Sequence, residues 1–586
     1  MLPPVDRQPP RATSNAIDLY IRTYYSLLRS SGDVRVRAFE EAHVFSESSL
    51  HAGARDEKPD VAAFAYAAAR LPGCMPAVRR MILGQSSEQF RAAGFDVSEW
   101  TVVTARGRRR PNRWSGGDCL AVYITSATDI DDLVPIVTAY QLEWNKMHRA
   151  LSMAPLGTAL AAGEVEDGPG LRGALADTLG LEAGDVDMLW PALGSAPMDV
   201  LQAIAAREVD LSLRLLAGTL LEYRRATQRW WFGIESAYRK RDAPPRPVYF
   251  VSSNTHVLVN LLGGYARTHR DEIFEYAREA NPEGLADDVS RVVEQGDEDE
   301  LNNFSYYLLR QYLHADAKGE RIKQVQAWDA AYGLSTLTSP GHLDVNAQLV
   351  ELSKLKPEGL DPRVRVPGLE ALAESDAVII NIDYPLGMAA YHHLTQLAQG
   401  VADIRGIYVM GKAATLNGRV GDVMLSTVAY DEHSENTYLF RNCFQAQDIA
   451  PYVHHGTVLD NQKALTVRGA FLQNHEYMSV FYREGYTVLE MEAGPYLSAI
   501  YEMVYPKRHP KNEVVHLSNL LPFEFGLIHY GSDTPYSKRQ SLLSKSLSYF
   551  GMDSTYGCAV AITRRILAQE IARLTTPARR GPDGGC

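Results

Sequence analysis

The sequence has little cysteine and no long apolar run. Only five of its 586 residues are cysteine, they lie far apart, and none forms a Cys-x-x-Cys pair: Cys74, Cys119, Cys443, Cys558 and Cys586. Widely spaced cysteines in odd number argue against a disulfide scaffold and favour free thiols in a reducing compartment. No segment holds the ~18 uninterrupted apolar residues that a membrane helix needs, so we expect no membrane partner.

Positive charge is also in deficit. The chain has 59 Lys and Arg against 71 Asp and Glu, a net charge of −12. A duplex nucleic acid needs a compensating basic surface, so it is excluded as the main ligand. The proline-rich start of the sequence lacks the apolar core of a signal peptide, which favours a cytoplasmic protein.

The length is too great for one hydrophobic core and predicts two or three domains. Up to about residue 240 most apolar residues recur at helical spacing, and only Leu120–Thr125 is typical of a strand. Near 243–247 a proline-rich run predicts the main boundary. We expect the following segments: a disordered leader at 1–15, a mainly helical N-terminal domain at 16–242, an α/β domain at 245–575 with a helical insertion at about 280–355, and a disordered tail at 576–586.

The second half alternates short apolar runs with helical stretches. Runs that are apolar on both faces indicate buried strands, here at 247–253, 377–382, 406–410, 422–428, 486–491 and 525–531. Such a pattern predicts a three-layer α/β domain, in which helices cover a mixed, largely parallel sheet. Ligands of open α/β sheets bind outside the carboxyl ends of the strands, so the polar residues that follow these runs predict a pocket.

Two of these strand ends carry unusual residues. Glu490 and Glu492 flank Met491 at the end of an apolar run, and carboxylates are rarely buried without partners. The vicinal hydroxyls of a ribose can donate to one carboxylate, and methionine packs softly on a sugar face. Ser532 and Asp533 follow another run. The simpler interpretations are solvated glutamates at an exposed strand end and a helix cap or Asx turn at 532–533.

Taken in order, these residues resemble the nucleoside phosphorylase family, which includes purine and uridine phosphorylases, methylthioadenosine/adenosylhomocysteine nucleosidases and AMP nucleosidases. The match rests on a Gly-Asp-Val segment at 421–423, Glu-Met-Glu-Ala at 490–493 and Ser-Asp at 532–533, and it covers residues 375–575. The resemblance implies a nucleoside-phosphorylase-like fold and cleavage of an N-glycosidic bond through an oxocarbenium-like sugar. It implies that Asp533 protonates or hydrogen-bonds the leaving base, Glu492 holds the ribose hydroxyls and Met491 packs on the sugar.

The same resemblance implies further contacts and partners. Glu490 helps to place the base or the nucleophile, and Ser532, Gly411, Lys412 and His433 belong to segments that contact the substrate. The ligand is a small-molecule nucleoside or nucleotide, with no cofactor and no metal, and inorganic phosphate is a possible co-substrate. Members usually form dimers or larger assemblies, so a homo-oligomer is expected.

The chain departs from the family at the nucleophile. Residues 252–256 contain neither the glycine of phosphorylases nor the water-activating glutamate of nucleosidases, and Lys412 replaces a small residue. Hydrolysis and phosphorolysis therefore both stay open. So do two other functions, a non-catalytic nucleoside or nucleotide sensor and a biosynthetic glycosyl-transfer enzyme on the same fold.

Three further patterns have simpler interpretations. The arginine-rich run at 106–113 is typical of a solvated loop, although phosphate or RNA binding is an alternative. Adjacent histidines at 392–393 and 454–455 point about 100° apart on a helix, which disfavours a shared metal ion. Trp230 and Trp231 are expected to pack between the helical part and the sheet.

Overall fold

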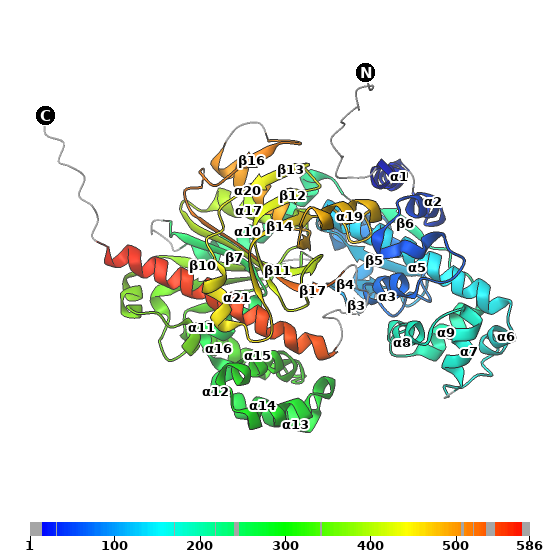
Figure 1. Cartoon of the computed structure of the whole chain (residues 1–586), viewed down its shortest axis with the longest axis horizontal. Coiled ribbons are helices and arrows are strands. Elements are labelled where there is room, and N and C mark those ends of the chain that lie inside the picture. Colours follow the sequence, from blue (N-terminus) through cyan, green and yellow to red (C-terminus); the bar gives the residue numbers. More distant parts are fainter. Residues whose placement is uncertain are drawn as a thin grey trace, which may run out of the picture.

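The computed structural model describes residues 15–30, 32–168, 170–216, 218–239, 245–339, 343–505, 509–519, 521–534 and 545–576. The described residues form two β-sheets with their covering helices, and Figure 1 shows the N-terminal part beside the larger sheet. Residues 1–14 and 577–586, which hold most of the predicted leader and tail, lie outside the described residues.

The N-terminal half contains more strand than its sequence pattern predicts. Most of its described residues are helical, as expected, but it also holds a sheet in the order β1-β6-β2-β5-β4-β3. Its strands are β1 Val34–Arg35, β2 Arg80–Gly84, β3 Thr101–Ala105, β4 Arg108–Trp114, β5 Cys119–Tyr123 and β6 Ser212–Leu215. Only β5 was predicted, because the short run of β2 fits helix and strand equally and β4 is almost wholly polar.

Helices pack around this first sheet. They are α1 Asn15–Ser30, α2 Arg37–Phe45, α3 Val61–Ala69, α4 Ser87–Ala92, α5 Ala127–Ser152, α6 Pro155–Ala161, α7 Leu171–Leu179, α8 Ala183–Ala192 and α9 Pro197–Ala206. The longest, α5, is buried along most of its length because it contacts α2, α3, α6, α7 and α9. Its N-terminus begins directly after β5 and faces the second half of the chain.

The larger sheet has the order β16-β13-β12-β14-β15-β11-β7-β10-β9-β8, and β17 pairs with β11 and β12. Its strands are β7 Val248–Ser253, β8 Leu334–Leu337, β9 Ala347–Glu351, β10 Val378–Asp383, β11 Ile404–Thr415, β12 Val423–Asp431, β13 Asn436–Leu439, β14 Val458–Thr466, β15 Val488–Glu490, β16 Val514–His516 and β17 Glu524–Asp533. All six predicted runs of the second half are strands.

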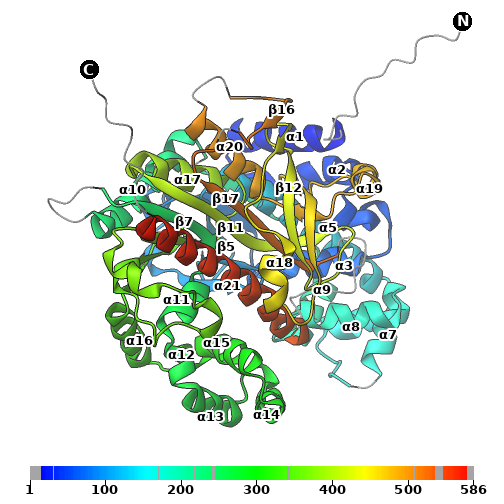
Figure 2. The same cartoon turned by 60° about the vertical axis from the view of Figure 1, so that its left-hand side comes forward.

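Helices cover both faces of this sheet. Tyr249 and Val251 of β7 pack with α21 Lys545–Thr575, whereas Val248 and Phe250 pack on the opposite face with α10 Leu220–Tyr238 and α17 Met388–Gly400. Alternate residues of a strand point to opposite faces, which is why a fully apolar run suits this position. Helix α21 lies along the sheet in Figures 1 and 2. The predicted three-layer α/β fold is confirmed.

The remaining helices of the second half are α11 Thr255–Gly263, α12 Tyr265–Thr268, α13 Arg270–Ala280, α14 Ala286–Gln295, α15 Glu298–His314, α16 Glu320–Ala331, α18 Ala446–Ile449, α19 His475–Arg483 and α20 Ala493–Val504. The stretch at about 280–355 is helical only as far as Ala331, and it then forms β8 and β9, which extend the sheet beyond β10. None of the described helices is long and apolar enough to span a membrane.

Five strands of the larger sheet close into a ring. Strand β11 pairs with β15, β15 with β14, β14 with β12, β12 with β17, and β17 pairs again with β11. Closure removes free strand edges, so this ring is a rigid frame for the residues at its rim.

Candidate functional site

The carboxyl ends of the parallel strands meet where the sequence places its polar residues. Ser253 of β7 is in register with Asp383 of β10, and Ala414 of β11 is in register with Asp533 of β17. On another side of β11, Ala414 also pairs with Leu489, which directly precedes Glu490. The acidic strand ends of β15 and β17 therefore flank the same part of β11.

The strand predicted at 406–410 is longer than its apolar run. Gly411 and Lys412 lie within β11, which continues to Thr415 because its last residues pair with β17 and β15. Gly411 is required here, since the ring of Tyr384 lies 2.3 Å from the position that a Cβ would take. Lys412 is exposed.

Glu490 is fully engaged by protein donors. Its Oε2 accepts hydrogen bonds from the backbone N–H groups of Glu492 at 2.6 Å and Ala493 at 2.7 Å, and its Oε1 accepts one from the Thr466 hydroxyl at 2.5 Å. These bonds tie the end of β15 to the N-terminus of α20, where a carboxylate also suits the helix dipole. Burial nevertheless raises the pKa of Glu490 above its ordinary value.

Glu492 keeps more of its hydrogen-bonding capacity. Its Oε1 accepts a hydrogen bond from the Gly387 N–H at 2.9 Å, and its Oε2 accepts a long one from the Met491 N–H at 3.3 Å. Each carboxylate oxygen can accept a second donor. The side chain is buried, and burial together with the neighbouring Glu490 raises its pKa. Two adjacent buried carboxylates repel each other when both are ionised, so this pair retains a proton more readily than solvated glutamates do.

Ser532 and Asp533 end strand β17. The Ser532 hydroxyl lies 3.2 Å from the Ala413 carbonyl and 3.1 Å from the Asp533 carboxylate. Asp533 is half-buried, and its negative charge acts on two neighbouring side chains, Lys412 and Tyr66. Burial raises the pKa of Tyr66, and the negative charge of Asp533 adds to that shift. Tyr66 belongs to α3, so the N-terminal half reaches this part of the site.

His433 is held by an aspartate. Its Nδ1 lies 3.0 Å from Oδ1 of Asp431, whose other oxygen accepts bonds from the backbone and hydroxyl of Ser434. The Nε2 atom of His433 is buried and has no hydrogen-bond partner among the described residues. The contact with Asp431 accounts for the position of the ring and leaves one nitrogen for another group.

Beside His433, Glu432 is a buried acid that sequence reasoning did not select. Its Oε2 accepts a hydrogen bond from the Arg468 backbone at 3.1 Å, and burial raises its pKa from 4.5 to about 8. When the pH exceeds 4.5, the Glu432 carboxyl loses its proton in the unfolded chain, whereas in the folded chain it keeps the proton up to about pH 8. The stability linked to Glu432 is therefore complete in acid and is lost as the pH rises through that range.

We expect Glu432→Gln to remove this pH dependence while keeping an acceptor for the Arg468 N–H. The melting temperature of the variant should exceed that of the wild type by about 2 °C or more at pH 9, and the two should converge near pH 5. Thermal unfolding followed by circular dichroism measures the difference. Glu484→Gln, at an exposed position, is the matched control. The same offset at both pH values would contradict the prediction.

His529 is a second group that the sequence did not reveal. It is fully buried on β17, neither ring nitrogen has a hydrogen-bond partner among the described residues, and its Nε2 lies 4.0 Å from Oε2 of Glu490. Burial lowers its pKa to about 3, so the ring is neutral. Only the register of β17 against β11 places it here, which no local pattern predicts.

The N-terminal half contacts the strand ends directly. The guanidinium of Arg109 donates to the Tyr384 carbonyl at 2.5 Å, and the hydroxyl of Thr128 accepts a hydrogen bond from the Met388 N–H at 2.9 Å. Gly387, which donates to Glu492, lies between these two contacts. Thr128 also fills the space where a side chain at residue 387 would lie, 2.5 Å from the Cβ position.

In return, the second half inserts a segment into the N-terminal core. This docking segment, residues 467–475, buries Phe471 and Leu472 among the apolar residues of the first half. Asn474 donates a hydrogen bond to the Ser46 carbonyl at 3.1 Å. The two halves therefore share one packed region next to the candidate site.

The arginine-rich run is not the solvated loop that its sequence predicts. Arg108 and Arg110 lie on β4 with side chains only 10% and 11% exposed, and both contact the buried carboxylate of Asp129, at 2.9 and 2.7 Å. The stretch is polar because it lies in an ionic interface rather than in an apolar core.

The histidine pair at 392–393 belongs to the packed core. His392 and His393 are buried on α17, burial lowers the pKa of each to about 4, and the His393 ring packs edge-on against Trp230 at 4.4 Å. No group of three or more histidine, cysteine, aspartate or glutamate residues is arranged to hold a metal ion in the described part of the chain.

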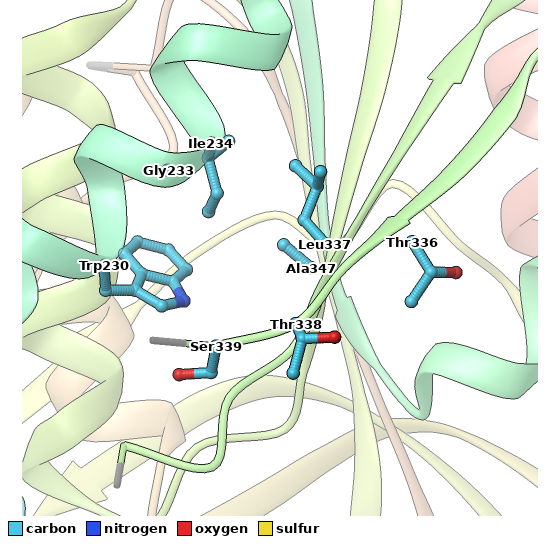
Figure 3. Close-up of a pocket in the computed structure, with 8 residues that line it drawn as sticks. All are labelled: Trp230, Gly233, Ile234, Thr336, Leu337, Thr338, Ser339 and Ala347. Atoms are coloured by element: carbon cyan, nitrogen blue, oxygen red, sulfur yellow. The ribbon is translucent and has the colours of Figure 1, made fainter. Parts of the chain in front are cut away.

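A separate small cavity lies between α10 and strands β8 and β9 (Figure 3). Figure 3 shows Trp230 and Ile234 of α10 facing Leu337 and Ala347 of the strands. Its lining lacks titratable side chains, and no predicted site residue contributes to it.

Comparisons with known proteins give one family and several solved structures. The model of a family of unknown function (DUF6909) matches residues 36–568. The comparison with curated proteins gave no match. Uridine phosphorylase from Vibrio fischeri ES114, complexed with 6-hydroxy-1-naphthoic acid, is 7% identical, covers 42% of this chain and 87% of its own, and has a TM-score of 0.28. Uridine phosphorylase from Schistosoma mansoni in complex with thymidine is 12% identical, with coverages of 32% and 70% and a TM-score of 0.24.

Proposed function

We propose that this chain, which belongs to the family of unknown function DUF6909, cleaves the N-glycosidic bond of a purine-type nucleoside or nucleotide. The observation that carries the proposal is the position of Glu492. Its buried carboxylate can accept further hydrogen bonds. Glu492 follows β15, which pairs with β11, and Asp533 ends β17, which pairs with β11 on another side.

Glu492 has the properties of a sugar-binding residue. Besides two backbone N–H groups, the Tyr384 hydroxyl interacts with this buried carboxylate, which leaves part of its acceptor capacity for the hydroxyls of a vicinal diol. Met491, half-buried beside it, offers a soft apolar surface to the sugar face. Glu490, with three protein donors, acts in our proposal by holding the start of α20 and thus the backbone of residues 491–493.

Asp533 is proposed as the proton donor to the base. Cleavage moves the electrons of the bond between C1′ and the base nitrogen onto the base, and a proton from Asp533 neutralises that charge as the sugar becomes oxocarbenium-like. Ser532 orients the carboxyl through its hydroxyl. Lys412, beside Asp533, attracts an anionic nucleophile or substituent, and His433 presents its free Nε2 to the ligand.

A sensor without catalysis is the second candidate, and one observation favours it. The segment that follows β7, residues 254–256, supplies no carboxylate that would activate water. His256 is the only basic side chain of that segment. Homo-oligomeric assembly and a cytoplasmic location stay predictions.

A product screen tests the proposal. The full-length chain is incubated with purine nucleosides and their 5′-monophosphates, with and without inorganic phosphate, and products are identified by mass spectrometry. We expect free base. Release that requires phosphate and yields a sugar 1-phosphate identifies a phosphorylase, and release without phosphate identifies a hydrolase. Binding without base release from any member would favour the sensor.

A further inference from the structure

The larger sheet ends in an open edge. Strand β8 is last in the strand order and pairs only with β9 among the described strands. The Glu351 N–H donates to the Gly333 carbonyl at 2.9 Å, and in an antiparallel pair bonded and non-bonded residues alternate. The backbone groups of Thr336 therefore point away from β9, and they have no partner among the described residues. Natural sheet edges are commonly protected by charged residues or proline, and residues 334–339 contain neither. This edge is open to another strand.

The cavity between α10 and the strands lies beside this edge. Its volume is about 210 Å³. Figure 3 shows Trp230, Gly233 and Ile234 of α10 on one side of it and Leu337 and Ala347 of the strands on the other. No charged group lines the cavity, so it suits an apolar side chain. Side chains of a strand alternate between two faces, and a chain added to β8 directs every second side chain toward α10 and this cavity.

The exposed face of α10 next to the cavity is basic. Arg229 lies one helical turn before Gly233, and Arg225 lies one turn before Arg229. Both arginines are exposed, and neither forms an ion pair within the described part of the chain. The ring of Phe232, which is 73% exposed, lies on the same face. Arginine and aromatic side chains together are typical of a protein-binding surface.

The acidic residues on and beside α10 have other roles. The charge of Arg229 acts on Glu88 of α4, but these two side chains form no ion pair. Glu222 caps the start of α10, and Glu235 pairs with Arg239 at its end. In a chain with a net charge of −12, this local excess of positive charge favours a negatively charged partner.

We propose that the edge of β8 and the basic face of α10 bind an extended acidic segment of a partner protein. The segment adds a strand to β8 through the backbone of Thr336, places one apolar side chain in the cavity, and directs carboxylates to Arg225 and Arg229. A second copy of this chain fits less well, because pairing of two β8 strands about a two-fold axis brings the arginines of both α10 helices together. A nucleic acid carries the charge but cannot continue the hydrogen-bond ladder of β8. The inference does not rest on the proposed glycosidic chemistry.

A synthetic peptide with blocked ends tests the inference on the full-length chain. Its residues alternate between threonine and glutamate, with one central leucine on the glutamate face, and a second peptide carries lysine in place of glutamate. Fluorescence anisotropy of the labelled peptides measures binding. We expect the acidic peptide to bind at least about tenfold more tightly than the basic one, and its affinity to fall with added salt. No binding of the acidic peptide, or equal binding of both peptides, would overturn the inference.

Filling the cavity is the sharpest change in the chain. A Cβ at Gly233 meets no atom within 4 Å, so Gly233→Leu places a side chain at the cavity without a clash, and leucine suits a helix better than glycine. We expect this variant to bind the acidic peptide about tenfold or more weakly. Gly173→Leu, at an exposed glycine of α7 that is equally open, is the matched control and should bind as the wild type does. Equal affinity in these two variants contradicts the inference.

Two further changes address the edge and the charges. Thr336→Pro removes the outward N–H and leaves the pairing with β9, so it should weaken the acidic peptide. Arg225→Gln combined with Arg229→Gln should weaken it and reduce the salt dependence. Light scattering tests the other occupants: self-association of the wild type that Gly233→Leu abolishes would assign the surface to a second copy and overturn the inference. Tighter binding of a single-stranded oligonucleotide than of the acidic peptide would overturn it as well.

Discussion

Replacing Asp533 with asparagine should reduce base release by on the order of 10³-fold while changing ligand affinity little. Asparagine keeps the size and the polar contact with Ser532 but has no acidic proton to transfer. The base would then leave as an anion, which is the costly path for a purine. Single-turnover rates and equilibrium binding of the same nucleoside measure the two effects separately.

A leaving group that needs no proton gives the sharper version of this experiment. 4-Nitrophenyl riboside departs as a stabilised phenolate, so Asp533→Asn should slow its cleavage far less than that of a nucleoside. Asp287→Asn, at an exposed position on α14, is the control and should not affect either substrate. Equal losses on both substrates would assign Asp533 a structural part, and unchanged nucleoside turnover would remove it from the mechanism.

Replacing Glu492 with glutamine should weaken the binding of ribosides by about 100-fold and leave the free base unaffected. The change removes the negative charge that makes hydrogen bonds from ribose hydroxyls strong, and bonds to charged groups contribute about 1.5–3 kcal/mol each. Glutamine keeps a carbonyl oxygen for the Gly387 N–H, so the loop between β10 and α17 should stay in place.

Titrations with a purine riboside and with the corresponding base measure this difference. Glu502→Gln on α20, which replaces the charged acceptor of the Tyr391 hydroxyl by a neutral one far along the same helix, controls for loss of helix stability. A riboside affinity equal to that of the wild type would show that Glu492 does not hold the sugar. Parallel losses for base and riboside would instead point to a disturbed α20.

Much of the second half could be predicted because its strands are short, apolar on both faces and followed by polar residues. Local periodicity is enough to place β7, β10 and β17, and the rare pairing of Glu490 with Glu492 at a strand end marks a polar site. The N-terminal sheet was not predicted, because β4 carries charged residues where a strand in an apolar core would carry apolar ones. Its arginines suit a strand only when Asp129 of α5 neutralises them.

The sequence by itself determined which residue types stand at the ends of the strands and therefore what chemistry is available there. The tertiary structure alone decided which of those ends are neighbours: the closed ring around β11, the neutral His529 beside Glu490, and the approach of Arg109 to Tyr384 from 275 residues away. Local preferences act over a few residues along the chain, whereas these contacts depend on strand register and on the docking of one half against the other, which only the folded chain brings about.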